Sequence, residues 1–245
     1  MNAWATAALD LLYPALCPVC EHGLDAGRRD PLCRACWTGI ERIVAPYCAT
    51  CGLPLPSFEP PAGALAPRCP ACVAGAPPFD YARAAGAYSG VLRDALHALK
   101  FGGKRTLARP LAALMLEQCG AVLGPDVDAL VPVPLAPGRE RERGFNQATL
   151  LAGHLSAASG LSVKSRWLSR RRSTRPQTEL TVGERRTNVA RAFAASSRVA
   201  DAHVVLVDDI VTTGATTAEC ARTLRAAGAR AVGVLAVARV LAVTL

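Results

Sequence analysis

Four Cys-x-x-Cys pairs lie close together in the first third of the chain and constrain its fold more than any other feature. They fall between residues 17 and 72 of 245, and their members are Cys17, Cys20, Cys33, Cys36, Cys48, Cys51, Cys69 and Cys72. A gap of two residues lets both thiolates of one tight turn face the same cation, and two such turns complete the tetrahedral sulfur site that Zn²⁺ favours. Eight cysteines therefore predict two structural zinc sites.

The spacing leaves open which pairs share a metal. Sequential pairing joins the first two pairs and the last two, whereas a cross-braced arrangement joins alternate pairs. Disulfides are the alternative to metal, but residues 1–17 lack the basic segment and cleavage site of a secretory signal, and cytoplasmic thiols stay reduced. We expect a cytoplasmic protein without a membrane span, because the apolar stretch 231–245 is short and contains Arg239.

The rest of the sequence predicts a separate α/β domain. Strand-like runs at 129–134, 204–207 and 231–238 alternate with helical patterns at 89–100, 146–160 and 214–227, and a basic strand is expected over 162–169. Strands that are apolar on both faces indicate a parallel sheet covered by helices. We expect residues 1–75 to form the zinc module, with an N-terminal helix, and residues 76–245 to form the α/β domain.

The most informative stretch is HVVLVDDIVTTGATT, residues 203–217. A buried strand ends in Asp208 and Asp209, and a short loop then opens a helix; the loop and helix start contain Thr212, Thr213, Gly214, Ala215, Thr216 and Thr217. Backbone N–H groups at a helix N-terminus suit a phosphate. Carboxylates at the carboxyl end of a parallel strand suit ribose hydroxyls. The alternative is an ordinary strand–turn–helix unit with Asp as a cap.

This string resembles the phosphoribosyl pyrophosphate loop of type I phosphoribosyltransferases, and further segments resemble the ComF family over nearly the whole chain. Those segments are Leu99–Arg105, Val131–Pro134, Arg139, Arg141–Gln147, Pro176–Thr178, Arg185–Asn188 and Ala192–Phe193, with the cysteine pairs on their amino side. The resemblance implies a type I phosphoribosyltransferase-like parallel sheet flanked by helices. It also implies that a small double zinc-ribbon module, with four cysteines at each site, precedes this sheet.

The resemblance also implies how a ribose phosphate is held. Asp208 and Asp209, the expected catalytic pair, would hold the ribose hydroxyls directly or through Mg²⁺, and residues 212–217 would hold the 5-phosphate. Purine-salvage enzymes carry an acidic residue three positions after the second carboxylate, where this chain has Thr212. A purine acceptor is therefore less supported, and the acceptor is not readable from the sequence.

Basic residues are expected around the pyrophosphate. The turn after Val131 and Pro132 would face it, and the resemblance implies that its charge would be neutralised by Arg139, Arg141 and Arg143. The loop from residue 170 to residue 186 would close over it. Lys100 is a further ligand-binding candidate, although with Lys104 and Arg105 it could equally solvate a helix end.

Three functions are consistent with a formal net charge of +9, which suggests an anionic partner. The first is an enzyme that transfers phosphoribosyl to an unidentified acceptor. The second is a non-catalytic competence factor that binds single-stranded DNA alongside DNA-uptake proteins, with Phe101, Phe145 and Trp167 as candidates for base stacking. The third is an adaptor that senses the ligand and docks a partner through its zinc module. Ligand binding is favoured over catalysis, because no acceptor site can be named.

Overall fold

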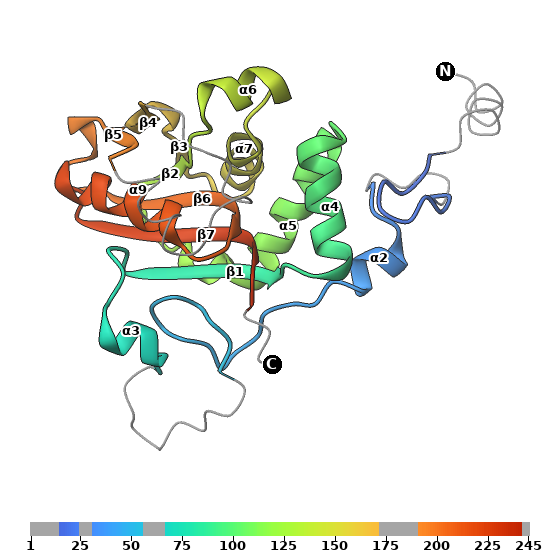
Figure 1. Ribbon diagram of the computed structural model, residues 1–245, viewed down its shortest axis with the longest axis horizontal. Coiled ribbons are helices and arrows are strands. Elements are labelled where there is room, and N and C mark those ends of the chain that lie inside the picture. Colours follow the sequence, from blue (N-terminus) through green and yellow to red (C-terminus); the bar gives the residue numbers. More distant parts are fainter. Residues whose placement is uncertain (1–14, 25–30, 56–66, 172–190, 242–245) are drawn as a thin grey trace.

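The computed structural model describes residues 15–24, 31–55, 67–171 and 191–241. Within these ranges, five parallel strands form one sheet in the order β1-β7-β6-β2-β3. Their bounds are β1 Tyr81–Ala87, β2 Ala129–Pro132, β3 Ser162–Val163, β6 His203–Val211 and β7 Ala231–Arg239 (Figure 1). The expected parallel sheet is confirmed, with β6 between β7 and β2.

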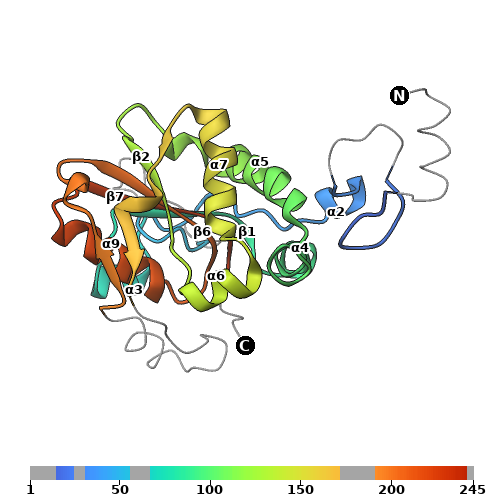
Figure 2. The same cartoon turned by 90° about the horizontal axis from the view of Figure 1, so that it is seen from above.

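Helices cover both faces of this sheet. One face carries α4 (Gly90–Phe101), α5 (Ala108–Cys119) and α7 (Gln147–Ser159), while the other carries α9 (Ala215–Ala226) and an antiparallel hairpin of β4 (Leu168–Arg170) and β5 (Phe193–Ala195) (Figure 2). Along β6, Val205 and Val207 pack on the first face and Val204 and Leu206 on the second. This alternation follows from the two-residue period of a strand.

Polar cap residues and glycines lie at the ends of the helices. Asn146 begins α7, because its side-chain oxygen accepts a hydrogen bond from the N–H of Ala148 at 2.9 Å, and Gly160 ends it in the left-handed region. Ser89 occupies the expected cap position before α4, but its hydroxyl donates to Glu41 at 2.9 Å instead of capping the helix.

Two sequence expectations about elements are corrected, and one helix is new. Strand β6 continues to Val211, so Asp208 and Asp209 lie within it. The expected strand at 162–169 is two strands, β3 and β4, separated by a 3₁₀ turn and belonging to different sheets. A short helix, α6 (Pro137–Arg143), was not expected from the sequence. Two expectations, the N-terminal helix and most of the loop over 170–186, lie outside the described residues, as do the segments 176–178 and 185–188.

Two short helices mark the cysteine segments. Helix α2 (Arg34–Thr38) follows Cys33 and lies next to α4, whereas α3 (Pro70–Ala74) follows Cys69 in another part of the molecule (Figure 1). Cys17 and Cys36 share an apolar core with Leu92 of α4. No helix in the described ranges has the length and apolar character needed to cross a membrane.

The chain between the two cysteine segments runs along the free edge of β1. The N–H of Ile43 donates to the carbonyl of Ala85 at 3.1 Å, and the N–H of Ala87 donates to the carbonyl of Glu41 at 2.9 Å. Gly86 permits this approach, because a Cβ there would lie 2.8 Å from the Glu41 carbonyl oxygen. Further along, the N–H of Ala82 donates to the carbonyl of Thr50 at 2.7 Å. The pairing covers an otherwise open sheet edge.

Chelation of the bound metal tests whether the domain boundary after residue 75 is placed correctly. Structural zinc contributes about 10–16 kcal/mol to folding in small zinc modules, so removing it is expected to unfold residues 17–72. The amides of Ala82 and Ala87 then lose their acceptors and exchange faster, while amides of β6 and β7 stay protected. Hydrogen exchange measured by mass spectrometry reports the protection of the β1 edge and of β6 and β7 in one experiment, and adding zinc back is the control. Equal loss of protection in β6 and β7 would show that the two parts fold as one unit.

Candidate functional site

The carboxyl ends of β2 and β6 lie side by side and position the candidate site. Pro132 of β2 is opposite Val207 of β6, and the N–H of Val133 donates to the Val207 carbonyl at 2.9 Å. The amide of Asn146 donates to the carbonyl of Val133 at 3.1 Å and fixes the turn that follows β2. The turn expected to face pyrophosphate therefore begins next to Asp208.

Asp209 is a buried carboxylate whose two oxygens both have partners. The residue is 4% exposed, its Oδ1 accepts a hydrogen bond from the amide of Gln147 at 3.0 Å, and its Oδ2 forms an ion pair with the ammonium of Lys100. Burial alone acts to raise the pKa of Asp209, but the charge of Lys100 and the hydrogen bonds outweigh it and lower that pKa. Lys100 is thus an internal ion-pair partner, not a solvated helix end.

Asp208 has a different environment from its neighbour. Its Oδ1 accepts a hydrogen bond from the N–H of Asp209 at 2.8 Å, and the other oxygen has no bonding partner among the described residues. Burial and the adjacent charge of Asp209 raise the pKa of Asp208 well above its ordinary value. The pair therefore divides into a charged, internally bonded carboxylate and a partly exposed one that is available to a ligand.

Arg143 is linked to Asp209 through Gln147. Its guanidinium donates to the side-chain oxygen of Gln147 at 2.6 Å and lies 5.2 Å from the centre of the Phe101 ring. Together with Lys100 and Arg139 it lines a cavity of about 490 Å³ beside Asp209. Arg141 is exposed and does not line this cavity. The structure therefore brings together three of the four expected basic residues.

The predicted phosphate loop, residues 212–217, comprises the connection from β6 to α9 and the first three residues of that helix. Gly214 has φ +75° and forms the N-cap of this helix, a conformation that disfavours any residue with a Cβ. Thr217 is buried, and its hydroxyl donates to the Gly214 carbonyl at 3.0 Å, so it braces the loop from inside. Thr213 is exposed. The helix behind the loop is twelve residues long and directs the positive end of its dipole toward this turn.

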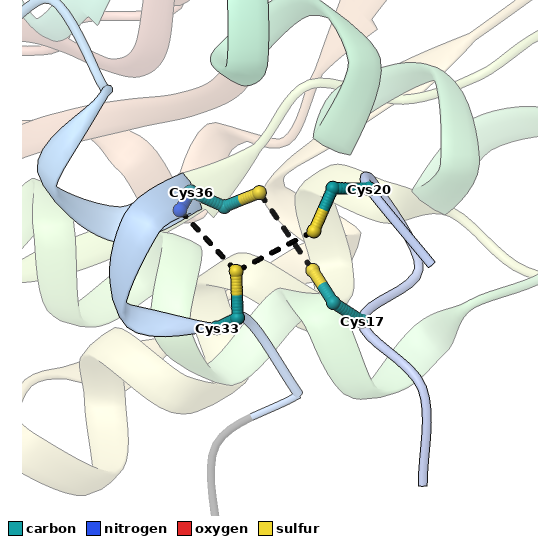
Figure 3. Close-up of side chains that lie close together, drawn as sticks. All are labelled: Cys17, Cys20, Cys33 and Cys36. Carbon is teal, nitrogen blue, oxygen red and sulfur yellow. Dashed lines mark hydrogen bonds between the residues drawn. The ribbon is translucent and has the colours of Figure 1, made fainter. Parts of the chain in front are cut away.

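In the described part of the chain, the eight cysteines of the Cys-x-x-Cys pairs form two clusters. The first cysteine cluster is Cys17, Cys20, Cys33 and Cys36, and the second is Cys48, Cys51, Cys69 and Cys72; within each, all sulfurs lie within 4.8 Å of one another. The sulfurs of the first cluster point toward a common centre (Figure 3). The structure thus shows sequential pairing and excludes the cross-braced alternative.

The sulfur separations fit zinc. Four thiolates at about 2.3 Å from a tetrahedral Zn²⁺ lie about 3.8 Å apart. The measured separations are 3.8 Å for Cys17 and Cys36, 3.5 Å for Cys20 and Cys33, and 3.7 Å for Cys51 and Cys69. Among the described residues neither cluster has a fifth ligand group, so both donor sets suit a structural ion.

Backbone N–H groups favour the thiolate form of one cysteine in each cluster. Cys48 accepts from the N–H of Cys51 at 3.5 Å and from that of Cys69 at 3.3 Å. Burial acts to raise the pKa of Cys48, but these N–H groups outweigh it and lower the pKa to about 6. A similar set of N–H groups lowers the pKa of Cys17 to about 6. A thiolate is the form that binds a metal.

Comparison with known proteins identifies both parts of the chain. Residues 8–73 match the family model of the double zinc ribbon domain, and residues 144–244 match that of the phosphoribosyl transferase domain. The DNA utilization protein YhgH of Salmonella typhi is 33% identical over 235 residues, covering 94% of this chain and 100% of its own length. Competence protein F of Haemophilus influenzae is 30% identical over 230 residues, covering 91% of this chain and 96% of its own. The chain belongs to the ComF family.

One solved structure shows a weaker likeness to this ComF protein. A glutamine phosphoribosylpyrophosphate amidotransferase from B. subtilis aligns with 52% of this chain at 25% identity and a TM-score of 0.35. The aligned part spans only 25% of that enzyme's length. The likeness carries no argument about the site of this ComF protein.

Gln147 is the site residue of this ComF protein to which the sequence alone assigned no role. It is 5% exposed and links Asp209 to Arg143. A signal was present, because residues 147, 151 and 155 form one helical stripe and the last two are buried leucines. A glutamine that heads an apolar stripe requires a polar partner inside the protein.

Replacing Lys100 by Met tests the ion pair with Asp209. Loss of one partner from a buried pair costs about 3–5 kcal/mol of stability, because the other charge stays buried alone. With Lys100, the lowered pKa of Asp209 gives a stabilisation that is present above about pH 4 and is lost as pH falls. Without Lys100, burial raises that pKa, so the variant should lose stability as pH rises from about 4 to 7.

Chemical denaturation of the wild type and of Lys100→Met across this pH range measures the effect. The double variant Lys100→Met/Asp209→Asn is the control, because it removes both charges and should recover most of the lost stability. A cost in Lys100→Met that does not change with pH would contradict the assigned ion pair.

Proposed function

We propose that this protein binds phosphoribosyl pyrophosphate, or a related ribose 5-phosphate, across the carboxyl ends of β2 and β6. The observation that carries the proposal is the adjacency of three features. These are the phosphate loop at the start of α9, the available carboxylate of Asp208, and a basic cavity lined by Lys100, Arg139 and Arg143. A ligand with phosphate at both ends of a ribose matches this order.

In this arrangement the 5-phosphate occupies the phosphate loop. The dipole of α9 and the left-handed turn at Gly214 favour an anion there. The ribose hydroxyls donate to Asp208, whose second oxygen faces no described partner. Asp209 is committed to Lys100 and Gln147, so its role is to position these two side chains, not to bind the sugar.

The pyrophosphate lies toward the turn after Pro132, with the basic cavity compensating its charge. Lys100 and Arg143 are held in place by Asp209 and Gln147, so they act as preorganised cations. Mg²⁺ bound with the pyrophosphate would add charge neutralisation, and a partly exposed carboxylate such as Asp208 is a suitable oxygen ligand. The reaction that such a site would support is pentosyl transfer with pyrophosphate as the leaving group.

Single-stranded DNA binding is a second candidate function, favoured by the environment of Phe101. This side chain is 67% exposed, packs against His97 with ring centres 4.6 Å apart, and contacts the guanidinium of Arg143. Exposed aromatic rings among cations suit base stacking and backbone binding. Phe145 is buried under Arg105 and is not available. The names of the relatives, DNA utilization protein and competence protein, agree with this candidate.

Calorimetric titration with phosphoribosyl pyrophosphate and Mg²⁺ tests the first proposal. Asp208→Asn is expected to weaken binding by about 10- to 100-fold, because a hydrogen bond to a charged group contributes about 1.5–3 kcal/mol. Binding by the wild type should also release a proton, because the raised pKa of Asp208 must fall when its carboxylate accepts the ligand. Titrations in buffers of different ionisation enthalpy detect this proton, which the variant should not release.

Asp201→Asn is the matched control for that titration. Asp201 is exposed, precedes β6 at the opposite end of the strand, and has φ +59°, a conformation that Asn tolerates. The Asp201→Asn variant should bind phosphoribosyl pyrophosphate with the affinity of the wild type. Wild-type protein that fails to bind millimolar phosphoribosyl pyrophosphate would refute the ligand proposal.

Fluorescence anisotropy with a labelled oligothymidylate tests the DNA candidate. Phe101→Ala is expected to weaken binding by about tenfold, since stacking on one base contributes about 1–3 kcal/mol. Val73→Ala, an equally exposed apolar site on α3, is the control and should have no effect. Asp208→Asn should bind DNA with wild-type affinity if DNA contacts only the basic residues of the cavity, Lys100, Arg139 and Arg143. Unchanged affinity in Phe101→Ala would remove the stacking argument.

A further inference from the structure

The two cysteine clusters differ in how far solvent reaches their sulfurs. In the first cluster the ligand atom of Cys20 is exposed and that of Cys33 is partly exposed, whereas in the described structure all four ligand atoms of the second cluster are buried. Cys51 and Cys72 border a cavity near the phosphate loop, yet their ligand atoms are among the buried ones. The two clusters therefore offer the same donor set with different access.

A hollow of about 480 Å³ lies beside the exposed side of the first cluster. Its lining includes Cys20 and Cys33, together with Ala35 of α2 and Val91 of α4. The sulfurs of Cys20 and Cys33 are 3.5 Å apart and face each other (Figure 3). A small solute in this hollow meets two neighbouring sulfurs of one metal site.

The other two cysteines of this cluster are protected by packing. Cys17 is 0% exposed and Cys36 is 5% exposed, and both belong to one apolar core with Leu92 of α4. Cys36 also borders the hollow, but its ligand atom is buried. The cluster thus has an inner pair that solvent does not reach and an outer pair that it does.

We propose that Cys20 and Cys33 form an oxidative modification site. Hydrogen peroxide converts this outer pair to a disulfide, and the zinc ion of the first cluster is released while that of the second is retained. The proposal concerns a different part of the molecule from the ribose-phosphate site and does not depend on it.

The chemistry requires only the peroxide and two protons from solvent. A sulfur that binds Zn²⁺ is a thiolate, and an accessible thiolate attacks peroxides. The Sγ of Cys20 attacks one peroxide oxygen, the O–O bond breaks, and a sulfenic acid forms while hydroxide leaves and is protonated to water. The Sγ of Cys33 then attacks the Cys20 sulfur, the S–S bond forms, and the S–O bond breaks to give a second hydroxide, which becomes water.

Loss of the metal follows from the loss of two ligands. The two sulfurs together give up two electrons, and the peroxide is reduced to two molecules of water. Only Cys17 and Cys36 then remain as thiolates, which is half of the tetrahedral set that a structural zinc requires. The second cluster keeps its ion because its sulfurs are buried.

Zinc release from the zinc-loaded full chain under hydrogen peroxide tests the inference, with a chromophoric chelator as the indicator and a sample without peroxide as the blank. One of the two ions is expected to leave at least about tenfold faster than the other, because oxidation of a thiolate follows its exposure. Trypsin cleaves after Arg34 and so separates Cys33 from Cys36. Mass spectrometry of the unreduced digest should find Cys33 linked to Cys20 once the fast ion has left.

Two variants should slow the fast release by about tenfold, because each reduces access to the outer thiolates. Cys20→His keeps a zinc ligand but removes the exposed sulfur, and Ala35→Phe narrows the hollow. Cys51→His and Ala71→Phe are the matched controls, because they make the same changes at the corresponding positions of the second pair of Cys-x-x-Cys segments, and they should keep the wild-type rate of the fast release. Zinc content is measured first, so that a variant that has lost an ion is not compared.

Three results would overturn the inference. The first is release of both ions at one rate, or no release at millimolar peroxide. The second is a disulfide that joins other cysteines than Cys20 and Cys33. The third is a wild-type rate of release in both Cys20→His and Ala35→Phe.

Discussion

The buried carboxylate of Asp209 determines how the side chains of the candidate site are arranged. An unpaired carboxylate in the interior would cost several kcal/mol, and here Lys100 from α4 and Gln147 from α7 pair with it. Both helices therefore meet the sheet at the carboxyl end of β6. Gln147 in turn bonds Arg143 at the end of α6, so one carboxylate sets the positions of two cations that the sequence places far apart.

Two adjacent residues of the same type acquire different chemistry from this packing. Side chains of a strand alternate between its faces, and Asp209 lies on the side that carries Lys100 and Gln147. Asp208 lacks such partners among the described residues, and burial with a neighbouring charge raises its pKa. The result is one carboxylate with a lowered pKa that pairs with Lys100 and Gln147, and a second carboxyl with a raised pKa. A single motif of two aspartates thus contains two carboxyl groups in different environments.

The cysteine clusters are connected to the α/β domain more closely than their separate sequence composition indicates. The segment between them pairs with the edge of β1, and the second cysteine cluster contacts Arg239 at the end of β7. The second cysteine cluster is thereby joined to the end of β7, where Arg239 lies opposite Val211, the last residue of β6.

The sequence by itself determined the elements whose signals are local. The Cys-x-x-Cys spacing indicates sulfur-bound zinc, apolar runs indicate a parallel sheet, and the string from Asp208 to Thr217 indicates a phosphate loop, because each depends on residues only a few positions apart. Tertiary structure alone decided the sequential pairing of the cysteines, the partner of Lys100, the role of Gln147 and the division between Asp208 and Asp209. These features depend on which side chains, distant in the sequence, come into contact in the folded protein and on how deeply they are buried. Residue spacing and hydrophobic periodicity contain no information about such contacts.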